Sequence, residues 1–408
     1  MLLPSLRDLL PLALVAPSTY PPAVPAELYS PLIGKKLLAT AELTPGVPTQ
    51  YPQFTTQEGN WTFLPVDTFS NGFVGASYYL MHERAHLCPK SLGGVPAAKW
   101  LELGRSSSTG IIPLENHTTV GHAVGFLAYP FVDELQINPG NETALHAVLK
   151  FGKVLADRFN PKVGCVRSWD NTTDPTDFEV IVDSVSTLEH LFVTSEITCN
   201  DTLIDIAISH ADTVMKNHIR PDGSSFHLLD YNSTTGKIID KRTTEGYAPN
   251  STWTRGHAFG MYGFANVYRR AGLKRHLDTA RRMATYFVNH VPASGIVPWD
   301  FNAPDKPFKP ADSAAATVAV KGLLLLAQQE LSLKPANKSG AAFYNNAALN
   351  ILSDTTKAFW KPEWQSLLSN ASVNFVANPP NYDTGLIYGD YFFLSLGNDL
   401  LKYGMAKC

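Results

Sequence analysis

Apolar residues recur at helical spacing in three separate segments, and this pattern constrains the fold more than any other feature of the chain. In 144–159 they stand three and four positions apart, and 202–217 and 276–289 repeat the pattern. Such spacing places apolar side chains on one face of a helix, which must be buried against a neighbouring element. The chain is therefore expected to be all-α.

Other segments are also predicted to be helices, and turn-rich loops separate them. They are 73–87, 118–130, 178–196, 252–271, 311–331, 341–359 and 385–403, with a weaker segment at 96–105. Alternating strands are scarce, and 236–241 is at most half of a small hairpin. No repeat of fixed period supports a consensus solenoid. Consecutive helices joined by polar loops favour antiparallel hairpins, and about a dozen of them fit a closed α/α toroid.

The chain is expected to divide into three parts. Residues 1–16, with an apolar run at 9–16, predict a signal peptide, although Pro11 interrupts the run. Residues 17–60 are rich in Pro, Thr and Ser and predict an extended N-terminal arm. Residues 61–408 then form the helical, catalytic-type domain. No stretch reaches the roughly 18 apolar residues of a spanning helix, so no membrane partner is expected.

Glycosylation sequons point to the secretory pathway. Asn-X-Ser/Thr occurs at Asn60, Asn116, Asn141, Asn171, Asn200, Asn232, Asn250, Asn337 and Asn370. Such sites belong on the surface loops of secreted proteins, although loops rich in Asn and Thr also create them by accident. The 4 cysteines contain no CxxC, and one bridge or buried free thiols fit equally well. We expect a secreted glycoprotein.

Charge and motifs exclude several classes of function. The net charge is −3 and no block of like charges occurs, which argues against a nucleic-acid or anionic-membrane partner. Serine-hydrolase, phosphate-loop and zinc-helix motifs are absent. The 12 histidines show no metal-ligand spacing. The remaining class is a soluble protein with a small-molecule or saccharide partner.

Several loops contain side chains suited to a sugar acid. Tryptophans, here Trp169 and Trp253, stack on sugar faces but also belong in protein cores. The guanidinium of an arginine, here Arg255, can donate two parallel hydrogen bonds to a carboxylate. Asp183 and His227 are groups that can move protons. Together these five residues predict a carbohydrate pocket.

Each of the polar candidates also has a purely structural interpretation. Asp183 follows the apolar triplet 180–182, where a semi-buried carboxyl has a raised pKa, but the residues alone favour the N-cap of the next helix. His227 fits a hydrogen-bonded loop histidine, and Arg255 fits a structural ion pair. His257 fits a satisfied polar contact better than a catalyst.

Ordered motifs over most of the chain, from about Phe69 to Tyr391, resemble glycoside hydrolase family 88, the unsaturated glucuronyl hydrolases. They are Val180-Ile181-Val182-Asp183, His210-Ala211-Asp212, His218-Ile219-Arg220-Pro221-Asp222-Gly223-Ser224-Ser225-Phe226-His227, Trp253-x-Arg255-Gly256 and Tyr388-Gly389-Asp390-Tyr391.

The resemblance implies an (α/α)6 barrel and a hydrolase without metal or organic cofactor. Family members act on oligosaccharides whose non-reducing uronic ring carries a C4=C5 double bond. An Asp protonates C4, water adds at C5, and the hemiketal opens to release the next sugar, so the carboxylate-spacing rule of ordinary glycosidases does not apply. A monomer that binds an oligosaccharide or another uronic-acid-containing molecule is expected.

The resemblance also assigns site residues by position. Asp183 corresponds to the general acid/base. Substrate contacts fall to His122, Trp169, His227, Trp253 and Arg255.

The chain departs from the family in its pocket. A second essential Asp follows the family's His, but Ala123 follows His122 here. Phe69 stands where a Trp is usual, and Phe259 ends a motif that the family ends in Trp. Losing a carboxylate that assists the acid would cost roughly 10² to 10⁴ in rate. The alternative to the family reaction is a diverged member with another substrate, such as a specialised metabolite, or one that only binds carbohydrate.

Overall fold

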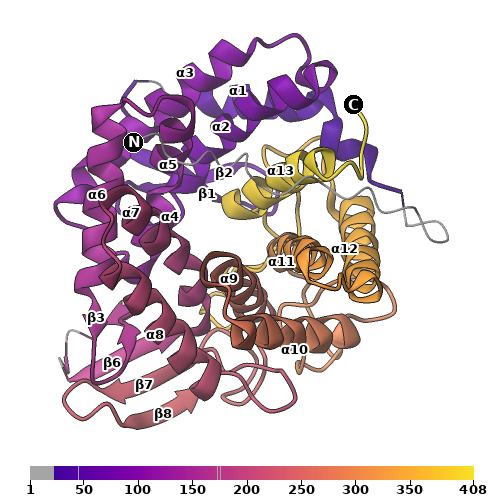
Figure 1. Ribbon diagram of the computed structural model, residues 1–408. Helices are drawn as coiled ribbons and strands as arrows, with labels where there is room; N and C mark the ends of the chain where they lie inside the picture. The colour runs from indigo at the N-terminus through magenta and orange to yellow at the C-terminus, as the bar shows by residue number, and fades with distance from the viewer. Residues whose placement is uncertain (1–22, 45, 172, 175) are drawn as a thin grey trace.

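Helices alternate between an inner and an outer layer around a ring in the computed structural model (Figure 1). The structure describes residues 23–44, 46–171, 173–174 and 176–408. The inner helices are α2 (Gly72–Leu87), α5 (Tyr129–Ile137), α7 (Glu189–Thr198), α9 (Thr254–Ala271), α11 (Ser313–Ser332) and α13 (Ile387–Lys402). The outer helices are α1 (Pro31–Glu42), α3 (Ala97–Ser108), α6 (Glu142–Asp157), α8 (Thr202–Asn217), α10 (Lys274–His290) and α12 (Lys338–Phe359). The ring closes where α13 packs against α2, which confirms the predicted (α/α)6 barrel.

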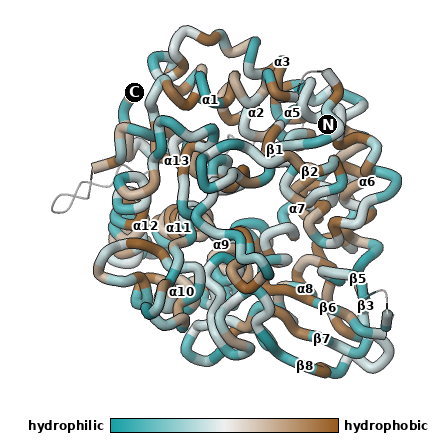
Figure 2. Tube along the Cα trace, turned by 180° about the vertical axis from the view of Figure 1, so that it is seen from behind, coloured by the Kyte–Doolittle hydropathy of each residue, from teal (hydrophilic) through white to brown (hydrophobic). Residues whose placement is uncertain are grey.

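The two layers differ in how much of each helix is buried. Outer helices such as α6, α8 and α10 bury one apolar stripe and expose the opposite face. The inner helices α9, α11 and α13 are buried on most sides, and α11 is buried continuously from Ser313 to Val320. Small residues allow this close packing: a Cβ added at Gly389 of α13 would lie 3.1 Å from Ala314 of α11. Figure 2 shows the ring from behind, with the sheet and α8 at one side.

Short elements connect the helices. They are α4 (Val124–Leu127), η1 (Ala26–Tyr29), η2 (Pro89–Leu92), η3 (Thr109–Glu115), η4 (Gly121–Ala123) and η5 (Val182–Leu188), where η denotes a 3₁₀-helix. Two hairpins pair β1 (Gln50–Thr55) with β2 (Trp61–Pro65) and β3 (Phe159–Asn160) with β4 (Cys165–Val166).

One antiparallel sheet of four strands positions the site. Its order is β5 (Trp169–Asp170), β6 (Asp177–Ile181), β7 (Leu228–Asn232) and β8 (Ile238–Arg242). Ile181 is paired with Leu228, and Leu228 with Arg242. The residues after β6, before β7 and after β8 therefore meet at one edge of the sheet.

The prediction of an extended arm over 17–60 is wrong for the residues that the structure describes. This segment contains η1, α1 and β1. Ser30 caps α1 by accepting the backbone N–H of Leu32, and Pro31 occupies the first turn. Leu28 and Tyr51 are fully buried, so the composition of the segment concealed real core positions. The helical domain thus begins well before residue 61, whereas 1–16 and 17–22 lie outside the described residues.

The helix predicted at 178–196 begins too early. Residues 177–181 form β6, 182–188 form η5, and the α-helix begins only at Glu189. The run Phe178-Glu179-Val180-Ile181 is rich in residues that favour strands, and pairing with β7 satisfies its backbone. The segment at 236–241 does contribute a strand, β8, but to a larger sheet than a hairpin.

A disulfide between Cys88 and Cys408 joins the end of α2 to the chain's last residue. Cys165 and Cys199 are free thiols, the first buried and the second exposed. The sequence left open either one disulfide bridge or buried free thiols, and the molecule contains one bridge and one buried free thiol. Within the described residues, every helix is too short or too polar to cross a lipid bilayer.

Candidate functional site

The shared edge of the sheet brings several predicted residues together. The backbone N–H of Val182 donates to the carbonyl of His227 at 2.9 Å, which extends the pairing of β6 with β7. Asp183 follows immediately, so its side chain lies beside His227. Trp169 lies on β5, where it is paired with Glu179, and it is the tryptophan of the sheet that lies near His227. Strand register, not sequence proximity, therefore assembles this part of the site.

Asp183 is a buried carboxyl whose Oδ2 atom has no hydrogen-bond partner among the described residues. The residue is 8% exposed, and its Oδ2 lies 3.7 Å from His227 Nε2, which is too far for a hydrogen bond. Among the described residues neither atom has a hydrogen-bond partner. The N-cap interpretation is wrong, because η5 begins one residue earlier and Ile181 precedes it without any side-chain cap.

Burial raises the pKa of Asp183 from 3.8 to about 7. The negative charge of Glu245 adds to this rise in the pKa, and the guanidinium of Arg255 opposes it. A large fraction of Asp183 is therefore protonated near neutral pH. This is the protonation state that a general acid needs.

His227 is held between two tryptophans. Its ring centroid is 5.7 Å from that of Trp169 and 4.7 Å from that of Trp253. Burial, followed by the charges of His218 and Arg255, lowers its pKa to about 3. His227 is therefore a neutral hydrogen-bonding group in an aromatic wall, which suits the face of a sugar ring.

Arg255 lies on the first turn of α9 and is tightly bound within the protein. Its Nη1 donates to Asp312 Oδ2 at 2.6 Å and to the carbonyl of Ser372, and its Nη2 donates to the carbonyl of Val373 at 2.9 Å. The guanidinium carbon also stands 4.7 Å from the ring centroid of Trp253. The structural ion pair that the sequence left open is therefore present, and it orients the guanidinium beside the pocket.

His122 contacts the backbone behind the pocket. Its ring is buried, with Nδ1 3.3 Å from the carbonyl oxygen of Ser168, the residue before Trp169. Burial lowers the pKa of His122 to about 4. The neighbouring Ala123 is 4% exposed and packs in the core. A direct contact of His122 with substrate stays a prediction.

Two further residues of α9 have structural roles. His257 uses both ring nitrogens, one with the Ser225 hydroxyl at 3.0 Å and one with the Met283 carbonyl at 3.0 Å. It is the satisfied polar contact that the sequence indicates. Phe259 packs against Phe126 and belongs to the core.

Sequence reasoning missed four residues of the site. Thr244 places its hydroxyl 2.9 Å from His227 Nδ1, and Glu245 places Oε2 3.8 Å from Arg255 Nη2. Asp312 anchors Arg255, and Tyr388 lies under its guanidinium at 5.7 Å. Only Tyr388 stood in a recognisable motif. The other three come from loops whose local sequence carries no signal for the pocket.

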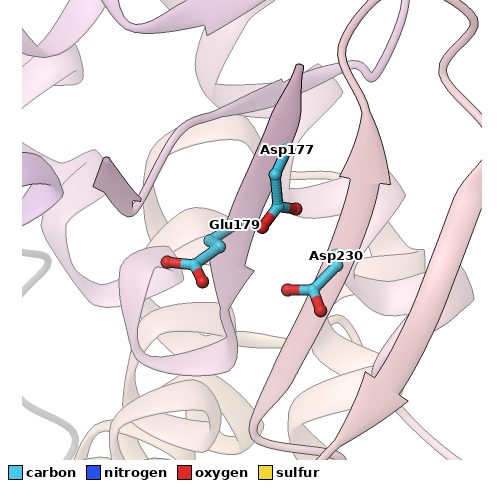
Figure 3. Close-up of side chains that lie close together, drawn as sticks. All are labelled: Asp177, Glu179 and Asp230. Carbon is cyan, nitrogen blue, oxygen red and sulfur yellow. The ribbon is translucent and has the colours of Figure 1, made fainter. Parts of the chain in front are cut away.

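Three carboxylates on the same sheet could hold a metal ion, but two of them already have a partner in the protein. Asp177 and Glu179 on β6 and Asp230 on β7 have ligand oxygens within 4.8 Å of one another (Figure 3). Arg242 forms an ion pair with Asp230, and the side-chain amide of Asn171 donates to Asp177. We therefore assign no metal to this cluster.

Comparison with known proteins gives the family. No family model matches the chain. An unsaturated glucuronyl hydrolase of Formosa agariphila is 31% identical over 340 residues, which cover 81% of this chain and 79% of that protein. The enzyme of the same name from Bacillus sp. strain GL1 is 31% identical over 276 residues, 67% of this chain and 72% of that protein. A crystal structure of an unsaturated glucuronyl hydrolase specific for heparin superposes with a TM-score of 0.80 at 25% identity, covering 93% of this chain and 97% of that one. The chain therefore belongs to the unsaturated glucuronyl hydrolases, glycoside hydrolase family 88.

Proposed function

We propose that this protein hydrates the C4=C5 bond of an unsaturated uronic sugar at the non-reducing end of an oligosaccharide and so releases the next sugar. The observation that carries the proposal is the Asp183 carboxyl, which is buried, unpaired at Oδ2 and has a pKa raised to about 7. Relatives that act on unsaturated glucuronyl and unsaturated chondroitin disaccharides, according to their names, support this substrate class.

The proposed reaction needs one proton donor that becomes a base. The Asp183 hydroxyl gives its proton to C4, and the ring oxygen stabilises the cation that forms at C5. Water then adds at C5, and its proton returns to the Asp183 carboxylate. The product is a hemiketal, which opens to a keto group and expels the neighbouring sugar. Asp183 ends in its starting state, so the cycle closes without a cofactor.

The other pocket residues would bind and orient the sugar. Trp169 and Trp253 offer aromatic faces for its C–H surfaces, and His227 Nε2 is the buried polar atom available to a hydroxyl. Arg255 supplies positive charge toward the uronate carboxylate. We propose substrate-binding roles for these four residues and for His122.

An activity assay tests the proposal directly. Purified protein is incubated with unsaturated chondroitin and heparin disaccharides, and the vinyl-ether absorbance is followed, with the saturated disaccharides as a control. We expect absorbance to fall for at least one unsaturated disaccharide. Binding without consumption, measured by calorimetry, would instead support a carbohydrate-binding descendant.

We further propose that the protein is a secreted glycoprotein. The disulfide between Cys88 and Cys408 supports an oxidising compartment. The four sequon asparagines that are exposed are Asn60, Asn116, Asn200 and Asn250. By contrast, Asn337 caps α12, and Asn370 has a left-handed backbone and donates its side-chain amide to Asp383.

Glycans are therefore expected at the four exposed asparagines and not at Asn337 or Asn370, because a glycan needs an open surface. Peptide mass spectrometry after enzymatic deglycosylation in water labelled with heavy oxygen marks each occupied site, because the asparagine becomes an aspartate that carries one oxygen from the water. Protein purified from the medium of a secreting eukaryotic host is the sample, and an Asn200→Gln variant controls the assignment at one site. Medium-derived protein that carries no glycan at any of the four sites would contradict the proposal.

A further inference from the structure

A second carboxylate stands at the same edge of the sheet as Asp183. Arg242, the last residue of β8, is paired with the first residue of β7, which directly follows His227. The next residues after Arg242 therefore run alongside His227, and Thr244 contacts that ring at 2.9 Å. Glu245 follows Thr244, so the strand topology delivers its carboxylate to the pocket.

The carboxylate of Glu245 shares a cation with Asp183. Its Oε2 lies 3.8 Å from Arg255 Nη2, and 27% of the side chain is exposed. Asp183 borders the same turn of α9, because a Cβ added at Gly256 would lie 2.9 Å from Asp183 Oδ2. Two carboxylates from different loops therefore flank the start of α9.

The loop that carries Glu245 is fixed in place. The buried carboxylate of Asp300 accepts the N–H of Tyr247 at 2.9 Å and the hydroxyl of Ser251 at 2.6 Å. A Cβ at Gly246 would lie 2.4 Å from the same carboxylate, so the backbone approaches it closely. Glu245 is thus presented from an anchored loop, as a site residue must be.

We propose that Glu245 is the second carboxylate of this pocket, replacing the one that the chain lacks at Ala123, and that it acts through Asp183 as a positioning residue. The inference rests on the proposed function, in which Asp183 is the acid. The names of the relatives describe a substrate and a reaction, whereas this inference assigns a role to a particular residue.

The electrostatics of the site support this role. The negative charge of Glu245 raises the pKa of Asp183, while Arg255 lowers it. Without Glu245, the negative charge that raises the Asp183 pKa is lost, which favours the ionised form that cannot protonate C4. Glu245 therefore offsets the cation that the pocket needs for a uronate.

The other titratable or charged groups around Asp183 do not change charge between pH 5 and 8. From η4, α8, the start of β7 and α9 come histidines whose pKa burial lowers to about 4 or about 3, namely His122, His210, His218, His227 and His257. Glu189 of α7 is kept ionised by Arg269 and Arg270, and burial raises the pKa of Tyr388 on α13 above its usual value. Burial also raises the pKa of Glu245. Glu245 is therefore the neighbouring charge that adds to the effect of burial in raising the pKa of Asp183.

Glu245 also has a consequence for substrate binding. Nη1 of Arg255 is occupied by Asp312 and Ser372, and Nη2 gives one hydrogen to the carbonyl of Val373, which leaves the second Nη2 hydrogen for a substrate carboxylate. Glu245 stands on that side, so its charge competes with the uronate for the guanidinium. Removing the charge is expected to lower KM about threefold or more while it lowers kcat, a split that a merely structural residue would not produce.

The test measures the titration of Asp183 with and without the Glu245 charge. Because an ionisable buried group makes stability depend on pH, the stability difference between a protein and its Asp183→Asn variant, plotted against pH, gives the midpoint of Asp183 without any substrate. Glu245→Gln is expected to move this midpoint down by about one pH unit. The alkaline limb of kcat is expected to move down by about the same amount.

Matched variants separate this effect from a change in net charge. Asp240→Asn removes the same charge from an exposed position in the middle of β8 and is expected to leave the midpoint in place. Glu245→Asp keeps the charge and is expected to keep the midpoint near that of the natural protein. An unchanged midpoint in Glu245→Gln would overturn the inference, whether or not the protein turns over the disaccharide. Absent turnover with a shifted midpoint would overturn only the proposed function.

Discussion

Asp183→Asn is expected to lower kcat by roughly 10²- to 10⁴-fold, because asparagine cannot give a proton to C4. In the natural protein, kcat is expected to fall as pH rises through about 7, where Asp183 loses its proton. KM should change little, since the amide has the same shape and keeps the contacts of the pocket wall. Steady-state kinetics on an unsaturated disaccharide from pH 5 to 9 measures both effects. Asp170→Asn, beside Trp169 but half-exposed and paired with Arg158, is the control and should keep its activity.

The same substitution should stabilise the protein at high pH. The pKa of Asp183 is raised in the folded state, so ionisation opposes folding once the pH passes the unfolded value of 3.8. The Asn variant should therefore equal the natural protein in stability below about pH 4 and exceed it by up to about 4 kcal/mol above pH 7. Chemical unfolding at pH 4 and pH 8 checks this. A loss of activity without any gain in stability at pH 8 would show that Asp183 is not held protonated by burial.

The helices were predictable from local sequence because both layers of the ring leave a trace in it. An outer helix such as α10 shows an apolar stripe, and an inner helix such as α11 shows a long apolar run with small residues. Closure of the ring was not predictable in this way. Closure depends on the contact between α13 and α2, and the sequence of neither helix indicates where the other one lies.

The two errors in the fold have different physical origins. In the N-terminal segment, Pro and Thr dominate the composition, but a few apolar side chains such as Leu28 and Ile33 decide where the chain packs. At 177–181 the pattern fits a buried helix or a buried strand, and pairing with a strand that begins at Leu228 decides between them. Such a distant partner cannot be read from a local window.

The role of Asp183 shows the limit for the site. Its local sequence fits both a helix cap and a buried acid. The structure decides because α9 passes close to the carboxyl at Gly256 and excludes solvent from it. Glu245 lies outside every motif for the same reason, since only the register of β7 with β8 brings it near His227.

Asp312→Ala is expected to cost about 3–5 kcal/mol of unfolding free energy, the largest stability loss of any change considered for the pocket. Asp312 is fully buried, and its Oδ2 pairs with Arg255 while its Oδ1 caps α11 by accepting the N–H groups of Ala314 and Ala315. Removing it leaves a buried guanidinium without its closest counter-charge and α11 without its cap.

Two control variants separate these contributions. Asp312→Asn keeps an oxygen for the cap and removes only the charge, whereas Asn337→Ala removes a cap of α12 that has no ion pair and should cost about 1 kcal/mol. Urea unfolding of the three variants measures how much unfolding free energy each of them loses. If Asp312→Ala costs no more than Asn337→Ala, the ion pair does not hold Arg255 in the protein, and the carbonyls of Ser372 and Val373 are its remaining anchors. If Asp312→Ala loses much unfolding free energy and Asp312→Asn loses most of the same amount, the ion pair holds Arg255 in place. Arg255 is then a fixed positive charge beside Asp183 and Glu245.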